Sequence, residues 1–84
     1  MPIKEVTVKK TGGLLNKDAA QLVQRAMRYE SDISFSQKFK KINAKSIMGV
    51  ISLGLKYGDK VVISAKGNDA EQAIEDIAEI LEKE

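Results

Sequence analysis

Residues 43–55 read Asn-Ala-Lys-Ser-Ile-Met-Gly-Val-Ile-Ser-Leu-Gly-Leu and are the most informative segment of this 84-residue sequence. Ser46 stands where the N-cap of a short helix is expected, because a serine hydroxyl can accept a hydrogen bond from a free N–H of the first turn. A phosphate on that hydroxyl would meet the same N–H groups and the positive end of the helix dipole. The segment therefore predicts a helix after Ser46 whose start can accept a phosphoryl group.

Apolar side chains cover a wide arc of this predicted helix. At 100° per residue they span roughly 220°, whereas one buried face needs only about 100°. The residues concerned are Ile47, Met48, Val50, Ile51 and Leu53. Part of the arc is expected to stay exposed beside Ser46, where it would suit a protein partner. The same residues also allow a simpler interpretation, in which Ser46 only caps an ordinary core helix.

Hydrophobic alternation and turn residues predict the elements on either side of this segment. Strands are expected at about residues 3–9, 33–36, 41–43 and 61–63, with a turn at 37–40. Helical spacing of apolar residues predicts two more helices. One is expected at about 17–29 with Asn16 as its N-cap, and one at 70–81, where Asp69 and Gln72 resemble a capping box.

The element order β-α-β-β-α-β-α predicts a single α+β domain over residues 1–84. Short connections favour a four-stranded antiparallel sheet with three helices on one face. The expected core consists of Val6, Val8, Leu22, Val23, Met27, Ile33, Val50, Leu53, Val61, Ile63, Ile74, Ile77 and Leu81.

Composition limits the chemistry. The chain has no histidine and no cysteine, which excludes a phosphohistidine, a reactive thiol and an imidazole-bound metal. No paired carboxylates or phosphate-cradling glycine loop appear, so we expect no enzyme activity, no cofactor and no metal. The apolar stretches are too short to cross a bilayer and no secretory signal is seen, which predicts a cytoplasmic protein.

Charge is distributed unevenly along the chain. The net charge is +2, yet residues 69–84 carry seven acids against one lysine, so the rest carries a net +8. Such asymmetry can mark an acidic or nucleic-acid partner for the basic part. It can equally reflect a solvated acidic helix that lies beside a basic body.

The segment at 43–49, with Ser-Leu-Gly at 52–54, the turn at Gly58 and Ala-Lys-Gly at 65–67, resembles the HPr family. HPr is the phosphocarrier of the bacterial sugar phosphotransferase system, and the resemblance extends over the whole chain. It implies an HPr-like open-faced β-sandwich with Ser46 as the regulatory serine.

The family's second motif is altered here. Where the family has a Gly-Leu/Ile-His-Ala-Arg-Pro-Ala type segment, residues 13–19 read Gly-Leu-Leu-Asn-Lys-Asp-Ala. Leu15 stands at the histidine that accepts phosphate from enzyme I, Lys17 at the supporting arginine and Asp18 at the proline. Leucine has no nucleophile and aspartate repels a phosphoryl group, so we expect no phosphohistidine transfer and no catalytic residue. Phe39 occupies a turn position where glycine is common, which predicts a different turn type or length.

An HPr-like chain with the serine motif and no histidine resembles the catabolite-repression members of the family. This implies phosphorylation of Ser46 by HPr kinase/phosphorylase, followed by binding to a LacI-type catabolite control protein as its corepressor. It implies no direct contact with nucleic acid or membrane, and a monomer or homodimer. The implied partner-binding residues are Lys17, Ala20, Lys45, Ile47, Met48, Gly49 and Ile51.

Two other functions remain open from the sequence. A degenerate HPr-like domain could bind a partner constitutively, with Ser46 serving only as a cap. The β-α-β-β-α-β part also fits a ferredoxin-like RNA-binding domain, for which Phe35 and Phe39 are the candidate stacking residues. The third strand, however, lacks the glycine-aromatic pattern that such domains carry.

Overall fold

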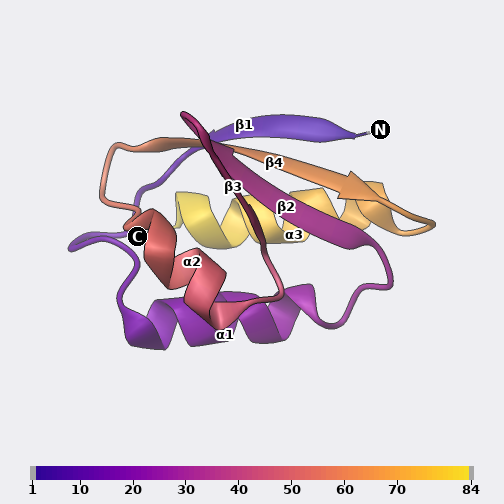
Figure 1. The fold of residues 1–84 in the computed structure, drawn as a ribbon, viewed down its shortest axis with the longest axis horizontal. Helices are drawn as coiled ribbons and strands as arrows, with labels where there is room; N and C mark the ends of the chain where they lie inside the picture. Colours follow the sequence, from indigo (N-terminus) through magenta and orange to yellow (C-terminus); the bar gives the residue numbers. More distant parts are fainter. Residues whose placement is uncertain (1, 84) are drawn as a thin grey trace.

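One antiparallel sheet covers three helices in the computed structural model, which describes residues 2–83 (Figure 1). The strand order is β1-β4-β2-β3, with each neighbouring pair antiparallel. The strands are β1 (Ile3–Thr7), β2 (Asp32–Gln37), β3 (Lys40–Asn43) and β4 (Lys60–Lys66). The helices are α1 (Asn16–Ala26), α2 (Ile47–Leu53) and α3 (Ala70–Glu82). All three helices lie on the same side of the sheet, so the predicted fold class and element order are confirmed.

The core forms between the inward face of the sheet and the helices. Strand alternation turns Ile33 and Phe35 of β2 and Ile63 of β4 inward, and all three are at most 1% exposed. Leu22 of α1 and Ile77 of α3 belong to the same core cluster and are fully buried. All but one of the predicted core residues are buried, and that exception lies at the end of α1.

Met27 was predicted in the core, and this prediction is wrong because its side chain is 64% exposed. The helix ends at Ala26, three residues earlier than predicted. The N–H groups after Met27 bond three residues back instead of four, as Arg28 N does to Arg25 O at 3.1 Å. At 100° per residue Met27 also lies about 90° from the middle of the buried stripe, at its edge. The start of α1 shifts as well, because Leu15, not Asn16, is its N-cap.

The hairpin between β2 and β3 separates the two phenylalanines. Phe35 is fully buried, whereas Phe39 at the turn is fully exposed. The burial of Phe35 removes it from any nucleic-acid stacking surface, which contradicts its place in the RNA-binding alternative. At this two-residue turn it is Lys38, with φ +55°, that adopts the left-handed conformation, so Phe39 avoids the strain expected for it.

Candidate functional site

The start of α2 is built around Ser46. Its backbone is extended (φ −108°, ψ 115°), and its Oγ accepts a hydrogen bond from the Gly49 N–H at 3.1 Å. Asn43 shapes the approach, because its Oδ1 accepts from Lys45 N at 2.8 Å and its carbonyl accepts from Ser46 N at 3.0 Å. The predicted N-cap is therefore confirmed, and the hydroxyl sits at the helix start with its side chain half-buried.

Gly49 leaves room for this cap. A Cβ at position 49 would lie 3.3 Å from the Ile42 Cβ and 3.4 Å from the Ser46 Oγ, closer than most side chains tolerate. The N–H of Gly49 is also the donor that the Ser46 hydroxyl uses. Gly49 was predicted as a partner contact, and the contacts here give it a second role, that of positioning the Ser46 side chain.

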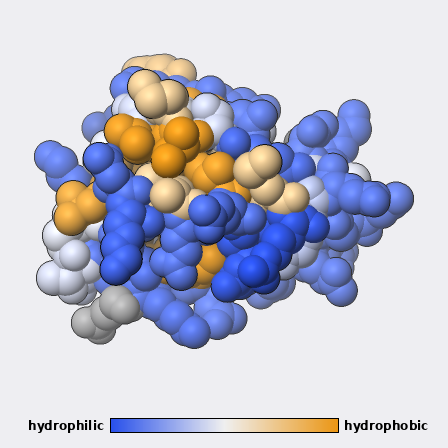
Figure 2. Space-filling view, turned by 90° about the horizontal axis from the view of Figure 1, so that it is seen from below, coloured by the Kyte–Doolittle hydropathy of each residue, from blue (hydrophilic) through white to orange (hydrophobic). Residues whose placement is uncertain are grey.

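The predicted apolar rim beside Ser46 is present. Val50 and Leu53 of α2 are buried, whereas Ile47, Met48 and Ile51 are 39%, 73% and 38% exposed. Figure 2 shows apolar side chains gathered on the face that carries α1 and α2, with hydrophilic side chains around them. The helix is thus apolar on more sides than the core covers.

The start of α1 lies against the end of α2. Leu14 N donates to Leu55 O at 3.0 Å, and Gly13, with φ +83°, comes so close that a Cβ there would lie 2.8 Å from the same oxygen. Leu15, which occupies the family's histidine position, is 64% exposed and makes no side-chain cap. The sequence identified Leu15 as a lost nucleophile but not as an exposed apolar side chain. Its extended backbone takes it out of the helical periodicity that would have buried it.

The two lysines among the predicted partner-binding residues, Lys17 and Lys45, lie toward opposite ends of α1. Lys17 is exposed in the first turn, with Ala20 half-buried three residues further on. The Lys45 ammonium donates to the Tyr29 carbonyl at 2.7 Å, just beyond the last residue of the helix. The structure therefore does not bring Lys17 and Lys45 together around Ser46, and Lys45 already has a partner.

A polar cluster fixes the segment that Lys45 contacts. The Arg25 guanidinium donates to Asp76 Oδ1 at 2.6 Å, and the Tyr29 hydroxyl donates to Asp76 Oδ2. The hydrogen bond to Asp76, together with burial and the Asp76 charge, raises the pKa of Tyr29. This cluster ties the end of α1 to α3.

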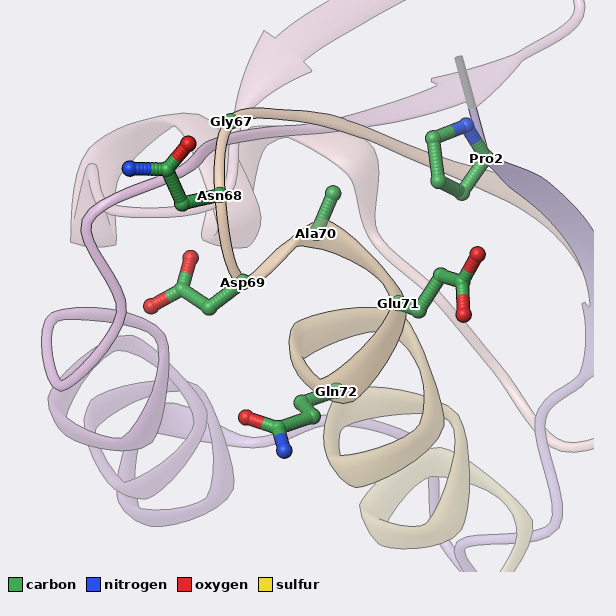
Figure 3. Close-up of a pocket in the computed structure, with 7 residues that line it drawn as sticks. All are labelled: Pro2, Gly67, Asn68, Asp69, Ala70, Glu71 and Gln72. Atoms are coloured by element: carbon green, nitrogen blue, oxygen red, sulfur yellow. The ribbon is translucent and has the colours of Figure 1, made fainter.

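The Asp69 side chain, at the start of α3, binds Glu30 and Ser31, which follow Tyr29 in the loop after α1. Asp69 was predicted to form a capping box with Gln72, and that prediction is wrong, because its side chain makes no cap. Its carboxylate instead accepts from Glu30 N at 2.9 Å, Ser31 N at 3.0 Å and the Ser31 hydroxyl. Figure 3 shows the carboxylate turned toward the loop after α1, at the rim of an open hollow lined by Pro2 and residues 67–72. The Ser31 hydroxyl and the Glu30 N–H lower the pKa of Asp69.

Neither a metal centre nor a membrane-spanning helix is formed by the residues that the structure describes. Within residues 2–83, no three histidine, cysteine, aspartate or glutamate side chains gather as a metal-ligand set. None of the helices in that range has the length and apolarity that crossing a bilayer requires. The start of α2 therefore remains the candidate site.

Comparison with known proteins agrees with this arrangement. Residues 3–83 match the family model described as PTS HPr component phosphorylation site. The HPr-like protein Crh of Halalkalibacterium halodurans is 42% identical over 81 residues, which covers 96% of each chain. The crystal structure of the phosphocarrier protein HPr from Bacillus anthracis superimposes with a TM-score of 0.93 at 40% identity, covering 96% of both chains.

A third relative shows how such chains can associate. The catabolite repression protein Crh of Bacillus subtilis is 40% identical and superimposes with a TM-score of 0.77. The match covers 96% of this chain and 93% of that one. Its crystal structure is described as a dimer with a swapped domain.

Proposed function

The chain belongs to the HPr family, and on that premise we propose that it is a non-enzymatic, cytoplasmic regulator of one domain, switched by phosphorylation of Ser46. HPr kinase/phosphorylase would attach the phosphate, and the phosphoserine form would act as corepressor of a LacI-type catabolite control protein. The names of its relatives, HPr-like protein Crh among them, support a regulatory role of this kind. Two structures of Crh are described as dimers, and the chain would work as a monomer or as a homodimer.

The observation that carries the proposal is the position of the Ser46 hydroxyl between a helix start and an exposed apolar rim. Its Oγ already accepts the Gly49 N–H, so an anion at this position would face free N–H groups and the positive end of the helix dipole. Phosphorylation would therefore add about −1.5 to −2 charges with little change in the backbone. A partner that reads the change needs a basic pocket for the phosphate and a groove for Ile47, Met48 and Ile51.

The start of α1 supports the absence of phosphohistidine transfer. Leu15 offers an exposed side chain without a nucleophilic atom, and Asp18, three residues further on, repels an incoming phosphoryl group. The exposed Leu15 instead enlarges the apolar surface on the side of α1 that adjoins the end of α2. We propose that the regulatory partner covers it together with the rim of α2.

Incubation with HPr kinase/phosphorylase and ATP tests the proposal directly. One phosphoryl group should appear by intact mass, stable to acid, and it should be absent in Ser46→Ala. Ser52→Ala is the matched control, because Ser52 is an exposed serine of the same helix whose hydroxyl donates to the Gly49 carbonyl at 2.7 Å. Labelling that survives in Ser46→Ala would refute the assignment of the site.

A constitutive binder is the second candidate function. Its support is that the Met48 and Leu15 side chains are exposed apolar groups, which a partner could cover. In that case a partner would bind the unmodified chain, and Ser46 would only cap α2. The affinities of the phosphorylated and unphosphorylated forms for the repressor distinguish the two candidate functions, because only the switched corepressor requires them to differ.

A further inference from the structure

One peptide group links the segment before Ser46 to the start of α3. Lys45 Nζ donates to the Tyr29 carbonyl at 2.7 Å, and the N–H of the same peptide unit belongs to Glu30. That N–H donates to Asp69 Oδ2 at 2.9 Å. An ammonium, a peptide and a carboxylate thus form a continuous chain of hydrogen bonds, in which each bond polarises the next.

Both ends of this peptide are held in place. The Tyr29 hydroxyl donates to Asp76, which also accepts from Arg25, and the Ser31 N–H donates to Asp69 at 3.0 Å. The peptide cannot easily turn to find another donor for its carbonyl. A change at Lys45 should therefore appear as a change in the Glu30 N–H bond.

Lys45 is the movable part of this chain. Its side chain is long and only half-buried, and it is covalently adjacent to Ser46. A phosphate on Ser46 would add about two negative charges on the residue next to Lys45, whose ammonium donates to a neutral carbonyl. The bond to the Tyr29 carbonyl already has an ionised donor, but a phosphate would add the attraction between opposite charges, which a neutral carbonyl does not offer.

We propose that Lys45 is a positioning residue for the phosphate. When Ser46 is phosphorylated, the phosphate draws the Lys45 ammonium away from the Tyr29 carbonyl. The loss weakens the Glu30–Asp69 bond, so the modification at α2 is reported at the start of α3. The inference rests on Ser46 being the modified residue, as proposed above, but it requires neither the kinase nor the repressor.

The test uses protein in which phosphoserine is installed at position 46 by semisynthesis, so that a failure of the kinase assay does not affect it. Two-dimensional ¹⁵N NMR follows the Glu30 amide, which should move upfield on phosphorylation. Lys45→Met should move it similarly without phosphate and should suppress the further change. Lys40→Met is the matched control, since Lys40 also donates to a backbone carbonyl, that of Ser52 at 3.3 Å, far from Glu30 in the sequence.

Phosphorus NMR gives a second, independent measurement. An ammonium beside the phosphate lowers its second pKa, so the titration midpoint should rise by about half a pH unit in Lys45→Met and stay unchanged in Lys40→Met. A Glu30 amide that does not respond to phosphorylation would overturn the coupling. An unchanged phosphate midpoint in Lys45→Met would overturn the role of Lys45. Neither result would bear on whether the kinase modifies Ser46 or the repressor binds it.

Discussion

The starts of α1 and α2 lie on the same side of the sheet, at opposite ends of the packed pair of helices, and they differ in their chemistry. At α2, Ser46 supplies a hydroxyl that caps the helix through Gly49. At α1, Leu15 occupies the cap position, and its side chain makes no hydrogen bond to the helix. The comparison shows that the position of a helix start in the fold does not depend on a reactive group at the cap. It depends on the buried residues of the helix, which determine how the helix packs.

The largest expected difference between the two helix starts is in which of them can be phosphorylated. Enzyme I with phosphoenolpyruvate should leave this chain unmodified, because Leu15 has no atom that can accept a phosphoryl group. Intact mass measurement checks this, with a histidine-bearing HPr in the same reaction as the positive control. An acid-labile adduct on this protein would contradict the prediction. Restoring transfer should need at least Leu15→His, together with Lys17→Arg and Asp18→Pro.

The next largest expected effect is on the free energy of unfolding, when a buried residue of α1 is truncated. Leu22 of α1 is fully buried, so Leu22→Ala should lower the free energy of unfolding by about 2–5 kcal/mol. Met27 on the same helix is 64% exposed, and Met27→Ala should change the free energy by less than about 0.5 kcal/mol. Urea unfolding of the two variants measures both. Similar losses in the two would mean that α1 docks in another orientation.

Substitutions at the two helix starts should change the free energy of unfolding by a smaller amount. Ser46→Ala removes the hydrogen bond from Gly49 N–H and should cost about 0.5–2 kcal/mol. Asn16→Ala at the start of α1 should cost less than about 0.5 kcal/mol, because Asn16 is exposed and is not the cap. Thermal unfolding of the unmodified variants checks the order. A larger loss for Asn16→Ala would reverse the assignment of the caps.

The stabilisation that Asp69 gives to the third helix start should be present at neutral pH and lost in acid. Its pKa is lowered by the Ser31 hydroxyl and the Glu30 N–H, while the unfolded chain keeps the ordinary value of about 3.9. The stabilisation is therefore complete above about pH 4 and is lost as the pH falls through the lower folded value. Asp69→Asn should make the melting temperature less dependent on pH between about 4 and 2. Parallel pH profiles for the two proteins would contradict this.

The sequence predicted the sheet, the order of elements and the Ser46 cap because these depend on local patterns. Alternation places Ile33 and Ile63 in strands, and a serine before an apolar run indicates a helix start. Asp69 shows where such reasoning fails, since its spacing to Gln72 fits a capping box but its carboxylate bonds to a loop some forty residues away in the chain. The contact of Lys45 with Tyr29 and the exposure of Leu15 likewise depend on how α1 and α2 pack, which no local pattern records.

The most direct test of the account is the affinity of a LacI-type catabolite control protein for the phosphorylated and unphosphorylated forms, measured by calorimetric titration. The phosphoserine form should bind at least about tenfold more tightly, which corresponds to about 1.4 kcal/mol. Met48→Asp should weaken the binding of the phosphorylated form, because its carboxylate would be buried unpaired. Equal affinity of the two unaltered forms would contradict the switch and leave Ser46 only as the cap of α2.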